Sequence, residues 1–399
     1  MASSDDVRPR IGNDAVTLRI LADENIPAVE HYVGAVASVE RFTGRELKPE
    51  QLQRADVLLV RSVTRVNADL LAGSAIRFVG TATSGVDHID RDYLASAGIA
   101  FTHAPGSNAN SVVEYVLAAI SAVGDYLERV LAGAPVGVVG YGVIGKAVVA
   151  RLQALGVKYR VYDPWLAPES IPRGAELAAV LDCAVITLHA ELTRQEPWPS
   201  YHLLDGGALA RIAPDSLLIN ASRGPVVDNR ALSALLQRDA GRDVVLDVWE
   251  GEPCIDQALL RQVRYGTPHI AGYSLDGKLL ATRMLVEVMA RELGLPWQDP
   301  GSAAGPPPSL LVPQNCDTDA ALLRQVLRQR YDIAVDDAAL RGVTLGADST
   351  AASAGFDQFR RQYPERRELL GSRADTGRLP HRAKNLLANL GCLLEEPLP

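Results

Sequence analysis

The chain has 399 residues, of which 47% are hydrophobic and 22% charged, so it is long enough for two or three domains, each with its own core. Its formal net charge of -8 argues against general binding to nucleic acid or to anionic membranes. It also lacks a run of roughly 18 apolar residues, the length that a membrane span needs. We therefore expect a soluble metabolic protein without nucleic-acid or membrane partners.

The first 17 residues mix charges of both signs and lack the apolar stretch of a secretory signal, which predicts a disordered extension. The four cysteines are far apart and show no metal-ligand spacing: Cys183, Cys254, Cys316 and Cys392. We expect reduced thiols in a cytoplasmic protein.

Beyond the extension, short apolar runs alternate with amphipathic stretches, which is typical of a parallel α/β unit. A first series of strands is predicted at 18–24, 55–62, 76–85 and 99–105. A helix rich in alanine and valine follows from about Ser111. A second series is predicted at 136–142, 158–164, 183–189, 216–224, 243–253 and 265–274.

The pattern therefore predicts two doubly wound, Rossmann-like parallel sheets with an interdomain cleft. In such sheets ligands bind at the carboxyl ends of the strands, where each of these runs turns polar.

A stretch rich in proline, glycine and serine, 294–315, separates the α/β series from about 85 residues with helical patterns. We expect a small C-terminal α+β domain there. The charged run RRQYPERRELL, residues 360–370, is expected to be the solvated face of a helix, with a phosphate site as the alternative. The expected domains are 18–110 with 273–300 for substrate, 111–272 for cofactor, a linker at 301–315, and 316–399.

The stretch GVVGYGVIGKAV contains Gly140, Gly142 and Gly145 in the G-x-G-x-x-G spacing of a dinucleotide-binding turn. Glycines also occur at plain strand-to-helix turns, so the motif needs an acid about 20 residues later. Asp163, at the end of the next strand, supplies it and can accept hydrogen bonds from the adenosine ribose. We expect NAD rather than NADP, because this carboxylate repels a 2′-phosphate.

Arg223, Glu252 and His269 stand at strand ends of the second series. Each alone is ordinary in a loop, but together they suit hydride chemistry. A histidine can accept the proton of a secondary alcohol, and a neighbouring carboxylate fixes its orientation. An arginine can clamp a substrate carboxylate with two parallel hydrogen bonds.

The order of the glycine turn, the acid, NASRGPVVD, DVWEGEP and TPHIAG resembles the D-isomer-specific 2-hydroxyacid dehydrogenase family over about residues 18–290. The resemblance implies NAD as cofactor and Arg223, Glu252 and His269 as catalytic residues. It implies a phosphorylated 2-hydroxy acid as substrate, with contacts at Ser62, Thr83 and Tyr273. We expect Arg61, which precedes Ser62 at the end of its strand, to help place this substrate. It places cofactor contacts at Gly140, Gly142, Val143, Ile144, Gly145, Asp163, Ala190, Ala221, Asp247 and Gly272.

Ala190 departs from the threonine that is usual in the family, so a backbone contact survives there whereas a hydroxyl contact does not. The tail is similar to a dimerisation domain, which implies a homodimer. Another dehydrogenase of the family, such as one for 3-phosphoglycerate, and a non-enzymatic NAD-sensing corepressor remain as alternatives.

Asp87, His88 and Asp90 cluster in SGVDHID, but neighbouring residues point to different sides of a strand or turn and cannot all face one ion. We expect no metal site.

Overall fold

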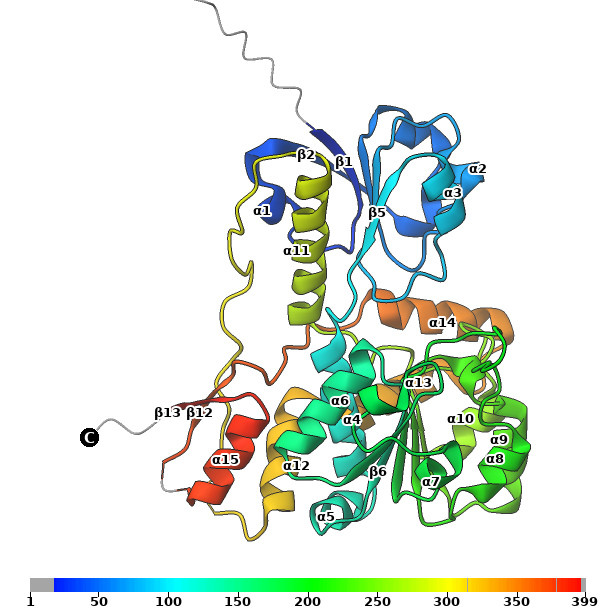
Figure 1. The fold of residues 1–399 in the computed structure, drawn as a ribbon, viewed down its shortest axis with the longest axis vertical. Helices are drawn as coiled ribbons and strands as arrows, with labels where there is room; N and C mark the ends of the chain where they lie inside the picture. The colour runs from blue at the N-terminus through cyan, green and yellow to red at the C-terminus, as the bar shows by residue number, and fades with distance from the viewer. Residues whose placement is uncertain (1–17, 314, 378, 396–399) are drawn as a thin grey trace, which may run out of the picture. The chain divides into compact units, whose positions relative to one another are not determined.

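The computed structural model describes residues 18–313, 315–377 and 379–395, which are drawn in colour in Figure 1. The extension expected at 1–17 lies outside the described residues. The chain divides into two compact units. One comprises the chain up to Ala104 with Thr282–Ala303, and the other comprises Pro105–Ala281 with the chain from Ala304. In the described part of the chain, no helix combines the length and apolar character that crossing a bilayer requires.

The first unit contains a parallel five-stranded sheet in the order β2-β1-β3-β4-β5. Its strands are β1 (Leu18–Asp23), β2 (Ala37–Phe42), β3 (Val57–Val60), β4 (Phe78–Thr81) and β5 (Ala100–His103). Its helices include α1 (Val29–Val33), α2 (Ala68–Leu71) and α3 (Arg91–Ser96), with 3₁₀ turns at Gly34–Val36, Gly44–Glu46 and Pro49–Arg54. The strand β2 is not predicted from the sequence, because it is a half-exposed edge strand without an apolar run.

The second unit contains a parallel six-stranded sheet in the order β11-β10-β9-β8-β6-β7. Its strands are β6 (Val136–Val139), β7 (Tyr159–Tyr162), β8 (Val185–Leu188), β9 (Leu217–Asn220), β10 (Asp243–Leu246) and β11 (Tyr265–Gly266). The strand order reverses at β6, which lies between β7 and β8. Ligands of doubly wound sheets bind at such a switch point. The predicted fold class is confirmed in its two parallel α/β sheets.

Seven helices of the second unit precede the first strand of this sheet or connect its strands. They are α4 (Ala109–Ala122), α5 (Tyr126–Leu131), α6 (Val143–Ala154), α7 (Leu177–Leu181), α8 (Gly206–Arg211), α9 (Asn229–Arg238) and α10 (Gln257–Gln262), with 3₁₀ turns at Pro168–Ser170 and Gly224–Val226. The longer α11 (Leu275–Glu292) begins in the second unit and continues into the first. Aspartates at 205, 228 and 256 start α8, α9 and α10 by accepting backbone N–H groups.

The C-terminal segment adds four helices and a two-stranded parallel sheet to the second unit. These are α12 (Asp319–Arg330), α13 (Ile333–Thr344), α14 (Ser349–Arg361) and α15 (His381–Asn389), with β12 (Arg373–Asp375) and β13 (Leu393–Glu395). The helix α12 packs against α4, as Figure 1 shows. Leu323 and Val326 of α12 share one hydrophobic core with Val116 and Ile120 of α4. The segment is thus part of the core of this unit.

The expectation that residues 360–370 form a solvated helix face is wrong. The helix α14 ends at Arg361, and the segment after it contains Pro364, which favours extended backbone in the residue before it. Arg366 and Glu368 are only 7% and 6% exposed. Both charged side chains are buried with hydrogen-bonding partners, without which burying a charge costs free energy.

Candidate active site

The glycine turn joins β6 to α6 at the switch point. Gly140 has a φ of 92°, and a Cβ there would lie 2.6 Å from the backbone nitrogen of Ala190. A Cβ on Gly145 would overlap the carbonyl oxygen of Gly140, whereas one on Gly142 would meet nothing within 4 Å. The turn therefore needs two glycines for its own packing, and the third leaves open space before the N-terminus of α6. That combination fits a pyrophosphate, which binds close to backbone N–H groups at a helix start.

Asp163 follows β7 beside this turn. Its carboxylate accepts hydrogen bonds from the N–H of Tyr141 at 2.8 Å and of Trp165 at 3.1 Å. Two carboxylate oxygens offer about four acceptor sites, so capacity remains for ribose hydroxyls. The residues present fit the dinucleotide that the sequence predicts, and Asp163 also fixes the turn on which the dinucleotide would lie.

His269 and Glu252 come together as the sequence analysis expected. Nδ1 of His269 lies 2.8 Å from Oε2 of Glu252, whose Oε1 accepts the N–H of Trp249 at 2.8 Å. Burial raises the pKa of Glu252, but the nearby His269 and the hydrogen bonds from His269 and Trp249 outweigh burial and leave the pKa below its ordinary value. Glu252 therefore stays ionised at neutral pH and can hold one tautomer of the imidazole.

The backbone of His269 has a φ of 57°, an uncommon conformation for a residue other than glycine. Asp247 holds it there. The carbonyl of Asp247 accepts the His269 N–H at 2.7 Å, and its carboxylate accepts those of Ile270 at 2.8 Å and Ala271 at 3.0 Å. The hydroxyl of Thr267 donates to the same carboxylate at 2.7 Å. Burial raises the pKa of Asp247, although these bonds and His269 counteract it.

Asp247 is 1% exposed, so its evident task is to position the His269 loop, a role that sequence reasoning missed. A strand-end acid before a histidine 22 residues later is too general a signal to reveal it. The cofactor contact assigned to Asp247 stays a prediction.

Arg223 leaves β9 on a loop that packs against the Glu252 loop. A Cβ on the next residue, Gly224, would overlap the carbonyl group of Trp249. The indole of Trp249 is 2% exposed and donates to the carbonyl of Thr267 at 3.0 Å. The loops that carry Arg223, Glu252 and His269 are thereby joined through one tryptophan at the carboxyl edge of the sheet.

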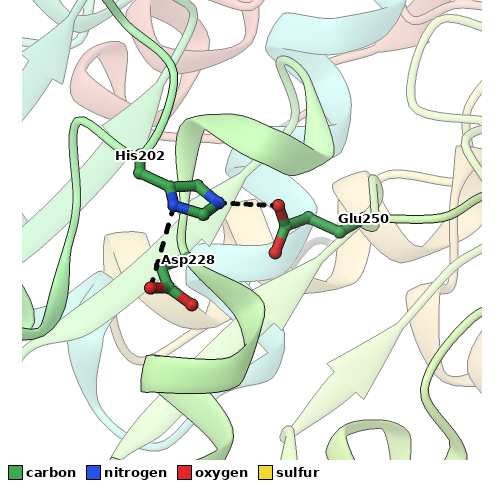
Figure 2. Close-up of side chains that lie close together, drawn as sticks. All are labelled: His202, Asp228 and Glu250. Atoms are coloured by element: carbon green, nitrogen blue, oxygen red, sulfur yellow. Dashed lines mark hydrogen bonds and ion pairs between the residues drawn. The ribbon is translucent and has the colours of Figure 1, made fainter.

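A second histidine supports the same region (Figure 2). Nε2 of His202 lies 2.7 Å from Oε1 of Glu250, and its Nδ1 lies 3.8 Å from Oδ2 of Asp228. The other Glu250 oxygen accepts the N–H of Asn229 at 2.9 Å. Among the described residues, these three are the one group whose His and acid atoms cluster as metal ligands could. Since they already bond to one another, we interpret them as a brace for the loop two residues before Glu252.

The other predicted residues of this unit also lie at loops around the sheet. Ala190 and Ala221 follow β8 and β9, and a Cβ on Gly272 would overlap the side chain of Asn108. Val143 and Ile144 form the first turn of α6, where Val143 is 53% exposed. Tyr273 lies four residues after His269, and its N–H donates to the carbonyl of Ile270 at 2.8 Å. Their contacts with cofactor and substrate stay predictions.

Arg61, Ser62 and Thr83 belong to the first unit, where they follow the adjacent strands β3 and β4. The hydroxyl of Thr83 donates to the carbonyl of Gly85 at 2.7 Å. These residues share one edge of that sheet, and their substrate contacts also stay predictions.

The SGVDHID residues have local structural partners. His88 Nε2 lies 2.8 Å from the hydroxyl of Thr81, and Asp90 caps α3 by accepting the N–H of Tyr93 at 2.9 Å. In the described part of the chain, Asp87, His88 and Asp90 do not form a group of potential metal ligands.

Two family models match the chain. Residues 117–271 match the NAD binding domain of the D-isomer specific 2-hydroxyacid dehydrogenases, and residues 308–391 match a domain of unknown function. Among solved structures, D-lactate dehydrogenase from Aquifex aeolicus, complexed with NAD and lactic acid, is 24% identical with a TM-score of 0.56 and covers 69% of this chain and 96% of its own. NAD⁺-bound 3-phosphoglycerate dehydrogenase from Entamoeba histolytica is 19% identical with a TM-score of 0.58 and covers 70% and 96%. These likenesses support the fold.

Curated relatives match nearly the whole chain. Erythronate-4-phosphate dehydrogenase from Cellvibrio japonicus is 43% identical over 378 residues, 94% of this chain and 99% of that protein. The Pseudomonas aeruginosa enzyme of the same name is 44% identical over 365 residues, 90% and 96% of the two chains. With the glycine turn, Asp163 and the His269–Glu252 pair in place, the chain belongs to the erythronate-4-phosphate dehydrogenases, within the D-isomer specific 2-hydroxyacid dehydrogenase family.

Proposed function

We propose that this protein oxidises 4-phospho-D-erythronate to (R)-3-hydroxy-2-oxo-4-phosphooxybutanoate with NAD, the second step of a route to pyridoxal 5′-phosphate. The observation that carries the proposal is the His269–Glu252 pair, 2.8 Å apart at the carboxyl edge of a sheet with a dinucleotide turn. The relatives of that name support the choice of substrate.

The chemistry follows from the side chains. NAD, when bound, supplies the acceptor for the hydride of the substrate's C2. His269 takes the proton of the C2 hydroxyl, while the Glu252 carboxylate holds the imidazole in place and stabilises its charged form. Arg223 clamps the C1 carboxylate in a two-pronged hydrogen bond, which fixes C2 beside the base.

We include a homodimer and a cytoplasmic location in this proposal. Support for the dimer comes from exposed leucines of the C-terminal segment: Leu311 is 84% exposed, Leu370 52% and Leu393 58%. We propose that the dimer interface buries these side chains, because removing apolar surface from water favours association. All four cysteines are free thiols, which fits a reducing compartment.

Turnover with NAD and a panel of acids tests the proposal. We expect 4-phospho-D-erythronate to give the highest kcat/KM, ahead of 3-phosphoglycerate and D-lactate. A higher kcat/KM for 3-phosphoglycerate would assign the chain to another reaction of the family. NAD binding without turnover of any acid would favour the NAD-sensing alternative.

A further inference from the structure

Arg360, in the last turn of α14, brings a positive charge from the C-terminal segment to the loop that carries His269. Its Nη2 donates to the hydroxyl of Tyr273 at 3.1 Å. Its guanidinium carbon lies 6.0 Å from the ring centroid of Phe356, one turn earlier on α14. Phe356 is 1% exposed, so its fixed ring favours one direction for the arginine side chain.

The guanidinium of Arg360 has more hydrogen-bonding capacity than the protein uses. It carries five N–H donors, and in the described part of the chain the bond to Tyr273 is the only one it makes. Its Nε is buried without a hydrogen-bond partner. Arg360 also forms no ion pair with any described residue, in contrast to Arg367 of the same segment, which pairs with Asp276 at 2.9 Å.

The surroundings of Tyr273 are positively charged. Nζ of Lys278 lies 4.9 Å from the centroid of the Tyr273 ring, and the guanidinium carbon of Arg360 lies 5.6 Å from it. Burial lowers the pKa of Arg360, but attraction to Tyr273, Glu252 and Asp247 outweighs burial and raises the pKa. Arg360 therefore remains charged within electrostatic reach of the catalytic carboxylate.

We propose that Arg360 is a further substrate-binding residue, which receives the phosphate group of the substrate beside the Tyr273 hydroxyl. This inference rests on the proposed function, whose substrate has two anionic ends. Arg223 takes the carboxylate next to the reacting carbon, so the phosphate two carbons beyond needs a second cation. A guanidinium matches phosphate geometry with two parallel hydrogen bonds, and Arg360 has unused donors and no competing carboxylate partner.

The test compares two substrates that differ only in the phosphate, 4-phospho-D-erythronate and D-erythronate, in the full-length protein with saturating NAD. Losing a charge-assisted hydrogen bond typically changes affinity on the order of 10- to 100-fold. We expect Arg360→Gln to raise KM for the phosphorylated acid by that factor, with kcat/KM for D-erythronate unchanged within about threefold. Inhibition by inorganic phosphate should weaken in parallel.

Arg361 is the matched control, because it is the next residue on α14 and is exposed. Arg361→Gln should leave both substrates unaffected. Arg360→Lys keeps the positive charge but loses the two parallel N–H donors of the guanidinium, so it should raise KM for the phosphorylated acid alone, by a smaller factor than Arg360→Gln. This variant also provides the test if Arg360→Gln does not fold. An equal loss on both substrates in the folded variants would show that Arg360 only anchors Tyr273, and would overturn the inference. A wild-type protein that oxidises neither acid would overturn the proposed function instead.

Discussion

Nδ1 of His269 lies 2.8 Å from Oε2 of Glu252, and Asp247 holds the backbone of His269 in a left-handed conformation. We predict that His269→Ala lowers kcat for oxidation by about 10² to 10⁴-fold, because a positioned base typically contributes that much. Glu252→Gln should lower kcat less, since the amide can still accept a hydrogen bond from the imidazole. Steady-state kinetics with 4-phospho-D-erythronate checks both. Near wild-type turnover in His269→Ala would remove this residue as the base.

Asp163 should set the choice between the two nicotinamide cofactors. Asp163→Asn keeps a hydrogen-bond acceptor for the Tyr141 N–H but removes the negative charge that repels a 2′-phosphate. We expect the ratio of the NADP and NAD dissociation constants to fall about tenfold, which corresponds to about 1.4 kcal/mol. Fluorescence titration of both cofactors measures the ratio. Equal affinities in the wild type would contradict the assignment of Asp163.

Two glycines of the turn should differ in what their substitution by alanine disturbs. Gly145→Ala introduces a methyl group against the Gly140 carbonyl oxygen, so it should lower the free energy of unfolding by about 1–3 kcal/mol and weaken NAD binding. Gly142→Ala meets no protein atom within 4 Å, so it should weaken NAD binding while the stability of the apoprotein is kept. Thermal unfolding without NAD, combined with titration, separates the two. A stable Gly145→Ala protein with normal NAD affinity would refute this packing.

His189, directly after β8, should make the protein acid-sensitive. Burial lowers its pKa to about 3, and its Nδ1 has no hydrogen-bond partner in the described residues. Because the unfolded chain takes up a proton near pH 6.5 and the folded chain does not, stability is complete above pH 6.5 and falls as the pH drops from 6.5 to 3. The loss at the lower end is on the order of 4 kcal/mol.

The variant His189→Gln should flatten this pH dependence, and denaturant unfolding between pH 7 and pH 4 measures the slope. The exposed His381 is the control, since His381→Gln should leave the slope unchanged. An identical slope in wild type and His189→Gln would show that other groups dominate acid unfolding.

The proposed dimer should depend on the exposed leucines of the C-terminal segment. Leu370 and Leu393 lie at 52% and 58% exposure near Gly391, where a Cβ would come within 2.8 Å of Leu370. Combining Leu370→Asp with Leu393→Asp should shift the sedimenting species from dimer to monomer, with the fold intact. The exposed Val143 at the glycine turn is a control position, where Val143→Thr should leave the sedimenting species a dimer. A double variant that remains dimeric would place the interface elsewhere.

The two parallel sheets, the glycine turn and the polar residues that follow the strands could be predicted from the sequence because they depend on local pattern. Most of the buried parallel strands are apolar runs, and the predicted site residues Asp163 and Asp247 directly follow β7 and β10. Contacts between residues far apart in the chain could not be predicted from the sequence. The bracing of Glu250 by His202 joins residues 48 positions apart, and Arg366 reaches the carbonyl of Ala271 across 95. The charged residues on either side of Pro364 have the sequence pattern of a solvent-exposed segment, because the distant partners that bury them are not visible in the local sequence.

The burial of helix α4 limits how the C-terminal segment can be removed from this enzyme. Residues Ser111 to Ser121 are buried without interruption, so α4 has no face suited to water. Even its one acid, Glu114, is satisfied by the backbone N–H of Leu369 in the C-terminal segment, at 2.6 Å. A dehydrogenase without that segment would need polar residues on the surface that α12 covers here. The C-terminal segment therefore cannot be removed from this protein, or added to a dehydrogenase that lacks it, unless the residues on the outer surface of α4 are changed as well.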